Sequence, residues 1–124
     1  MPRILLIEDD DSVRAMLRET LEHFGHTVIE ARNGTEGLAR FPHGNADLVI
    51  TDMVMPETEG FEVLRALRRT HPRVKIIAIS GAGADSGAGY LRMAKLLGAS
   101  TVLAKPFSAD VLLAAINELL PGGA

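Results

Sequence analysis

The residues best suited to chemistry in this chain are carboxylates, a serine and a lysine that each end or follow a short apolar segment. Glu8 and Asp9 come directly after the first such segment, and Asp52 comes after the third. Ser80 ends the fourth segment, and Lys105 follows the fifth. If these segments are parallel strands of one sheet, their carboxyl ends meet at the edge where such folds bind ligands. We therefore expect all five side chains at one site.

Three carboxylates gathered at one edge repel one another, and a bound cation is the usual relief. Hard oxygen ligands at this density suit Mg²⁺, which keeps several waters and completes its octahedron with a substrate oxygen. Phosphoryl transfer needs mainly in-line positioning and neutralisation of the phosphoryl oxygens. The pattern therefore predicts that Asp52 is a nucleophile that forms an acyl phosphate, with Lys105 and Ser80 in contact with the phosphoryl group.

Each of these residues also has a purely structural interpretation. Carboxylates before a helix commonly cap it and interact with its dipole, and we expect Asp11 or Ser12 to be the cap here. Asp52 could simply begin a turn, Ser80 could be structural, and Lys105 could be an exposed loop lysine. The arrival of all four groups at one edge favours the chemical interpretation.

The elements that must position these residues are visible as apolar periodicity. The predicted strands are nearly continuous apolar runs, as expected when both faces of a sheet are covered. They are Arg3–Ile7, Thr27–Ala31, Leu48–Thr51, Val74–Ser80 and Thr101–Ala104.

Segments of helical spacing lie between the strands. Asn33 and Glu36 have the spacing of a capping box, and Ser108 is expected to cap the last helix. The third helix must end before Pro72, and Gly98 is expected to close the fourth. The apolar positions that mark the first helix are Val13, Met16, Leu17, Thr20, Leu21 and Phe24, and those that mark the fourth are Tyr90, Met93, Ala94 and Leu97. Five strands alternating with five helices predict an α/β fold with an open, doubly wound parallel sheet.

Composition narrows the class of protein. The chain has 124 residues, a net charge of −3 and no cysteine. The lack of cysteine excludes disulfide frameworks, thiolate zinc sites and cysteine nucleophiles. Basic residues are scattered, so we expect no nucleic-acid binding. The apolar runs are too short to cross a bilayer, and the first residues leave no room for a secretory signal, so we expect a cytoplasmic protein without membrane association.

At the same residues, the sequence resembles the receiver domain of two-component response regulators over essentially its whole length. Each matching motif is short, but the set in this order and spacing is specific. The motifs are Ile4-Leu5-Leu6-Ile7-Glu8-Asp9-Asp10, Asp52-Met53-Val54-Met55-Pro56 with Gly60-Phe61, Ile76-Ile77-Ala78-Ile79-Ser80-Gly81, Gly98-Ala99, and Lys105-Pro106-Phe107.

The resemblance implies a flavodoxin-like (βα)5 fold with strand order 2-1-3-4-5. It implies that Asp52 accepts a phosphoryl group from a sensor histidine kinase or a histidine phosphotransfer protein. Asp9 would bind Mg²⁺ directly, Glu8 through water, and Val54 through its backbone carbonyl. We expect a single receiver domain over residues 1–124 with no output domain, so the signal would leave by docking on a target or by onward transfer to a histidine.

Two features depart from the family pattern. Many receivers carry a Tyr or Phe three residues before the lysine, and its rotation reports phosphorylation; here the position is Val102, which cannot rotate as a ring does. The glycine-rich segment 81–89 after Ser80 is longer than usual. It either carries the switching motion, which glycine makes easy, or is a tolerated surface insertion.

Three other functions are compatible with parts of this pattern. Haloacid-dehalogenase-like phosphatases also use an Asp nucleophile, but they need a second Asp two residues later, where this chain has Val54. A flavodoxin-like cofactor binder needs a first loop that holds phosphate, and the carboxylates of residues 8–11 would repel one. A receiver-like scaffold that is not phosphorylated remains the main alternative.

Overall fold

The computed structural model describes residues 2–53, 59–80, 92–105 and 107–120. Its strands are β1 (Arg3–Ile7), β2 (Thr27–Ala31), β3 (Leu48–Asp52), β4 (Lys75–Ser80) and β5 (Thr101–Ala104), and its helices are α1 (Asp11–His23), α2 (Gly34–Gly44), α3 (Glu59–Thr70) and α5 (Ala109–Leu119). Residues 92–96 form a further helical segment. The predicted strands agree with these bounds to within one residue at each end.

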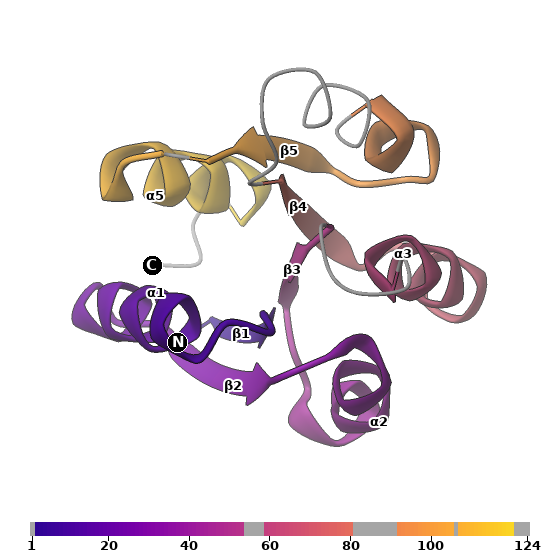
Figure 1. The fold of residues 1–124 in the computed structure, drawn as a ribbon, viewed down its shortest axis with the longest axis horizontal. Coiled ribbons are helices and arrows are strands. Elements are labelled where there is room, and N and C mark those ends of the chain that lie inside the picture. The colour runs from indigo at the N-terminus through magenta and orange to yellow at the C-terminus, as the bar shows by residue number, and fades with distance from the viewer. Residues whose placement is uncertain (1, 54–58, 81–91, 106, 121–124) are drawn as a thin grey trace.

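The strands form one parallel sheet in the order β2-β1-β3-β4-β5. Helices α1 and α5 cover one face of this sheet, while α2, α3 and the segment 92–96 cover the other (Figure 1). The predicted doubly wound, flavodoxin-like fold and its strand order are confirmed.

Two hydrophobic clusters fill the spaces between the sheet and its helices. Successive strand residues point to opposite faces. Leu5 and Ile7 of β1 therefore pack in the cluster beneath α2 and α3, whereas Ile4 and Leu6 pack in the cluster beneath α1 and α5. Every residue of β3, the central strand, is buried. Burial on both faces explains why the strands are continuous apolar runs rather than alternating ones.

The cap of α1 differs from the prediction. The N-cap is Asp10, and not Asp11 or Ser12: a carboxylate oxygen of Asp10 accepts from the backbone N–H groups of Ser12 at 2.9 Å and Val13 at 3.0 Å. Asp10 has the extended backbone that aims a cap side chain at the first turn, whereas Asp11 is already helical. The prediction failed by one or two residues because five carboxyl or hydroxyl side chains stand in a row at residues 8–12.

The other predicted caps are confirmed with one change. The Asn33 side chain accepts from Glu36 N–H at 2.8 Å, and Ser108 Oγ accepts from Val111 N–H at 3.2 Å. The Glu36 carboxylate, however, accepts from the backbone N–H of Arg32, so only half of the predicted capping box forms. Helix α3 ends two residues before Pro72, as expected.

Part of the predicted apolar stripe on α1 is exposed. Leu17 and Leu21 are buried against the sheet, but Met16 is 58% exposed and Phe24 is 52% exposed. A helix on a sheet buries a narrow stripe, and neither the sheet nor α5 covers Met16. On the segment 92–96, Ala94 is buried while Met93 is half-exposed; Tyr90 lies outside the described residues. No helix within the described ranges has the length and apolar character needed to span a membrane.

Candidate functional site

The parallel register brings three carboxylates together at the carboxyl edge of the sheet. Glu8 and Asp9 directly follow β1, and Asp52 is the last residue of the neighbouring β3. One carboxylate oxygen from each lies within 4.8 Å of the others. Glu8 and Asp52 are buried and Asp9 is exposed, so the cluster of three carboxylates extends from the interior of the protein to its surface.

Lys105 joins this cluster from β5, at the far edge of the sheet. Its backbone N–H donates to the Ser80 carbonyl at 2.8 Å, which holds the start of the lysine loop beside β4. Its ammonium then donates to Glu8 Oε1 at 3.1 Å and to Asp52 Oδ2 at 3.4 Å. One cation thus bridges two buried carboxylates that come from different strands.

Ser80 ends β4 at the same edge and is buried. Among the residues that the structure describes, its hydroxyl has no hydrogen-bond partner. A buried hydroxyl without a partner is costly, so a ligand oxygen or a water at this point would stabilise it. Val54 and the segment 81–89 lie outside the described residues. Val102 is half-buried, pairs with Ala78 and packs against the cluster beneath α3.

Burial controls the electrostatics of the site. The pKa of Glu8 is raised to about 7, mainly because the carboxyl is buried and also because the charge of Asp52 lies nearby. The hydrogen bond from the Asp10 backbone N–H and the charge of Lys105 act in the opposite direction and lower this pKa. Burial lowers the pKa of Lys105, but the charges of Asp52 and Glu8 and their hydrogen bonds raise it above its ordinary value overall. The ammonium is therefore charged at neutral pH and compensates only part of the carboxylate charge, so the site favours a further cation.

A family model described as the response regulator receiver domain matches residues 4–117. The chain belongs to this family. Receiver domains are signalling domains of two-component systems that accept phosphoryl groups from histidine kinases. The sensor kinase CckA of Brucella abortus is 40% identical over 119 residues, which are 94% of this chain and 12% of CckA. The chain spans about half or less of the length of the curated relatives it matches.

Solved receiver domains have the same fold. A response regulator receiver domain from Clostridium thermocellum superimposes with a TM-score of 0.88 and 33% identity, covering 97% of this chain and 94% of that one. The response regulator TrrA of Thermotoga maritima, crystallised in complex with Mg²⁺ and BeF, has a TM-score of 0.85 and 32% identity, covering 96% and 99%.

One contact of the receiver site was not expected from the sequence. Arg14 of α1 donates from Nη1 to the backbone carbonyl of Glu8 at 3.0 Å. The available signal was its position three residues after Asp11 on a helix, which is the spacing of a surface ion pair. That spacing predicts the pair with Asp11 but not the contact with the loop that carries the carboxylates.

Proposed function

We propose that this chain is a phosphorylation switch in which Asp52 accepts a phosphoryl group in the presence of Mg²⁺. The observation that carries the proposal is the convergence of Glu8, Asp9 and Asp52 with the ammonium of Lys105. Three hard carboxylate oxygens with incomplete charge compensation suit Mg²⁺. Glu8, Asp9 and Asp52 would hold the ion, and the family resemblance adds the carbonyl of Val54.

In the proposed reaction, a carboxylate oxygen of Asp52 attacks the phosphorus of a phosphohistidine. The O–P bond forms as the N–P bond breaks, and the imidazole leaves with the electron pair of that bond. Lys105 would contact one phosphoryl oxygen, and the Ser80 hydroxyl would donate to another. Bound Mg²⁺ supplies neutralisation of the charge on the phosphoryl oxygens. The chain transfers the group to itself and is not a turnover enzyme.

We propose a sensor histidine kinase or a histidine phosphotransfer protein as the donor. A groove of about 390 Å³ between α1 and α5 reaches Lys105, and its lining is mainly apolar: Val13, Met16, Leu17, Thr20, Lys105, Phe107, Ala109 and Leu112. An amphipathic helix of a partner protein can bind such a groove through its own apolar face. A donor helix in this groove would bring its histidine to the acidic site.

The phosphorylated form would then change its binding to a target or pass the group to another histidine. Ser80 is the proposed switch residue, with Val102 in the position where many receivers carry an aromatic ring. The predictions of a single receiver domain over residues 1–124, of a cytoplasmic location and of no nucleic-acid binding stay predictions.

The first test is phosphorylation by a small donor such as acetyl phosphate with Mg²⁺, followed by intact mass. We expect a mass gain of one phosphoryl group that Asp52→Asn abolishes. Asp47→Asn is the matched control. Asp47 lies just before β3, at the amino ends of the strands and away from the acidic site, where its carboxylate accepts from the Arg3 backbone N–H. An unmodified wild type under these conditions would favour the scaffold alternative.

A further inference from the structure

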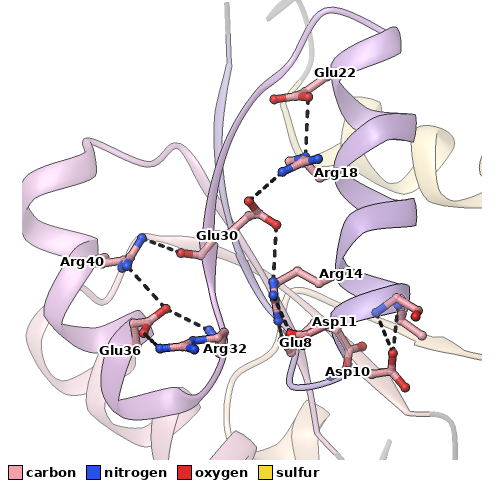
Figure 2. Close-up of polar contacts among 12 residues, drawn as sticks. Glu8, Asp10, Asp11, Arg14, Arg18, Glu22, Glu30, Arg32, Glu36 and Arg40 are labelled. Atoms are coloured by element: carbon pink, nitrogen blue, oxygen red, sulfur yellow. Dashed lines mark hydrogen bonds and ion pairs between the residues drawn. The ribbon is translucent and has the colours of Figure 1, made fainter.

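Arg14 connects the acidic loop to two other segments of the molecule. Besides the Glu8 carbonyl, its guanidinium donates from Nη2 to Asp11 Oδ1 at 2.7 Å and from Nε to Glu30 Oε1 at 3.3 Å (Figure 2). Its side chain is only 13% exposed. All three nitrogens of the guanidinium thus have acceptors, on the loop after β1, on α1 and on β2.

Glu30 of β2 is itself held in place. Its second carboxylate oxygen accepts from Arg18 Nη1 at 3.0 Å, and its backbone carbonyl accepts from Arg40 Nη1 at 3.0 Å (Figure 2). Glu30 therefore presents a fixed oxygen to Arg14. The ion pairs form a chain in which β2 orients Arg14, and Arg14 contacts the loop.

The Glu8 backbone is bonded on both sides. Its N–H donates to the Ala31 carbonyl at 3.0 Å, and its carbonyl accepts from Arg14. The carbonyl of Glu8 and the N–H of Asp9 belong to one planar peptide group. Fixing that carbonyl therefore fixes the direction in which the chain enters Asp9.

This restraint opposes the repulsion among the carboxylates. Glu8, Asp9 and Asp52 favour separation while no cation is bound, and the loop after β1 is the part that could move. A site held in its binding geometry loses less entropy when the ligand binds. The guanidinium charge is compensated by Asp11 and Glu30, so its repulsion of an incoming cation is small.

We infer that Arg14 is a positioning residue of the acidic site: it holds the Glu8–Asp9 peptide in the geometry that binds the cation, and Glu30 orients it. The inference rests on the proposed function, in which these carboxylates bind Mg²⁺. Partners that orient metal ligands typically contribute ten- to a hundred-fold in metal affinity.

The test compares Arg14→Lys with Arg18→Gln in the unphosphorylated protein. Arg18 lies one turn along the same helix and pairs with the same Glu30, but within the described residues it has no bond to the acidic loop. We expect Arg14→Lys to weaken Mg²⁺ binding by roughly ten-fold in calorimetry. Arg18→Gln should weaken it much less, because Arg40 still holds Glu30 and Arg14 keeps its bond to the Glu8 carbonyl. The phosphorylation rate of Arg14→Lys should approach that of the wild type at saturating Mg²⁺.

A second readout needs no metal. Amide exchange at Asp9 and Asp10 in the metal-free protein should be faster in Arg14→Lys than in Arg18→Gln, because only the first change releases the loop. If Arg14→Lys does not fold, Glu30→Gln replaces it, since that change keeps Arg14 but removes the charge that orients it. The Mg²⁺ affinity of Glu30→Gln should fall below that of Arg18→Gln.

The outcomes separate the two proposals. Normal Mg²⁺ binding by the wild type, with equal affinity and equal exchange in Arg14→Lys and Arg18→Gln, would overturn the positioning role alone and leave Arg14 as a structural brace. A wild type that binds no Mg²⁺ would overturn the proposed metal site, and the inference with it.

Discussion

The ionisation of Glu8 depends strongly on the fold. It is 2% exposed, its charged form pairs with the ammonium of Lys105, and the charge of Asp52 beside it is repulsive. Burial without full compensation disfavours the charged form, which explains a pKa raised to about 7. The same property makes Glu8 sensitive to a cation, because a bound divalent ion reverses the balance.

The raised pKa of Glu8 predicts how stability depends on pH. The pKa of Glu8 is about 7 in the folded state and 4.5 ordinarily, so the folded protein holds the Glu8 proton more tightly than the unfolded chain. The contribution of this proton to the free energy of unfolding is therefore full below pH 4.5 and is lost as the pH rises through 7. In Mg²⁺-free buffer, we expect Glu8→Gln to remove this loss between pH 5 and 8. Urea unfolding of the wild type and of Glu8→Gln across that range measures the loss of stability. Burial lowers the pKa of His26, but His26 is present in both proteins, so the difference between their pH profiles reports Glu8.

Addition of Mg²⁺ is the control for this prediction. The ion binds the carboxylate form, so it should stabilise the wild type more at pH 8 than at pH 5. Parallel pH profiles of wild type and Glu8→Gln would show that Glu8 ionises as it does in the unfolded chain.

At the scale of elements, α1 has two roles on two faces. Leu17 and Leu21 attach it to the sheet, and the exposed Met16 lines the groove that reaches Lys105. The same helix therefore supports the loop of the acidic site and contributes to the surface that a phosphodonor would meet.

Met16→Glu tests the proposed role of the groove. Since Met16 is 58% exposed, we expect a change in unfolding free energy within about 0.5 kcal/mol. Phosphorylation by a histidine phosphotransfer protein that modifies the wild type should slow by roughly ten-fold, the effect of about 1.4 kcal/mol at an interface. Acetyl phosphate should modify both proteins equally.

Val111→Glu is the matched control, because Val111 is 47% exposed on α5 outside the groove lining. Equal slowing in Met16→Glu and Val111→Glu would count against the proposed role of the groove.

The start of α3 approaches the site through Gly60. A Cβ at this position would lie 2.7 Å from Met53 Cα and 2.8 Å from the Asp52 carbonyl oxygen, and backbone cannot rotate away as a side chain can. Glycine here allows the helix to pack directly on the residue that follows the central strand.

We expect Gly60→Ala to lower the unfolding free energy by about 1–3 kcal/mol, the usual cost of overpacking. Gly37→Ala is a matched comparison on α2, since the atoms nearest to its Cβ would belong to the side chains of Ile7 and Ala31 and not to the backbone. The Gly37 change should cost less, because Ile7 can adopt another rotamer and alanine favours a helix. Equal urea midpoints for the two variants would contradict the argument.

At the scale of the whole molecule, the site exists only when the sheet is assembled. Glu8 follows β1, Asp52 ends β3 and Lys105 follows β5, so groups separated by up to 97 positions meet at one edge. A ligand of this site therefore binds the folded chain and not the unfolded one, and it stabilises the fold by mass action.

Mg²⁺ with beryllofluoride, a phosphoryl mimic, should raise the unfolding free energy by about 2.7 kcal/mol at a hundred times its dissociation constant. Neither component alone should have the full effect. Lys105→Ala should lose most of the beryllofluoride contribution while keeping part of the Mg²⁺ effect, since the carboxylates remain. Thermal unfolding with each component and with both gives the comparison; full stabilisation of Lys105→Ala would exclude the lysine from phosphoryl contact.

Local chemistry along the chain was enough to predict most of the fold and the convergence of Glu8, Asp9, Asp52 and Lys105. Strands covered on both faces produce unbroken apolar runs, so their bounds could be predicted to within one residue. The carboxyl ends of parallel strands meet by geometry, so the position of Glu8, Asp52 and Lys105 after such runs predicts that they converge. Asn33 and Ser108 act on N–H groups three residues away, and such short-range contacts are visible in a sequence.

Only the tertiary structure decided which faces are covered and which charges meet. Periodicity reports the direction of a side chain on its own helix and not the neighbour beyond it, so Met16 had the pattern of a core residue and is exposed. Asp10, rather than the equally suitable Asp11, caps α1 because the turn after β1 leaves Asp10 extended. Arg14 contacts the acidic loop because β2 holds Glu30 beside α1, and contacts between residues distant in the chain depend on how the elements pack.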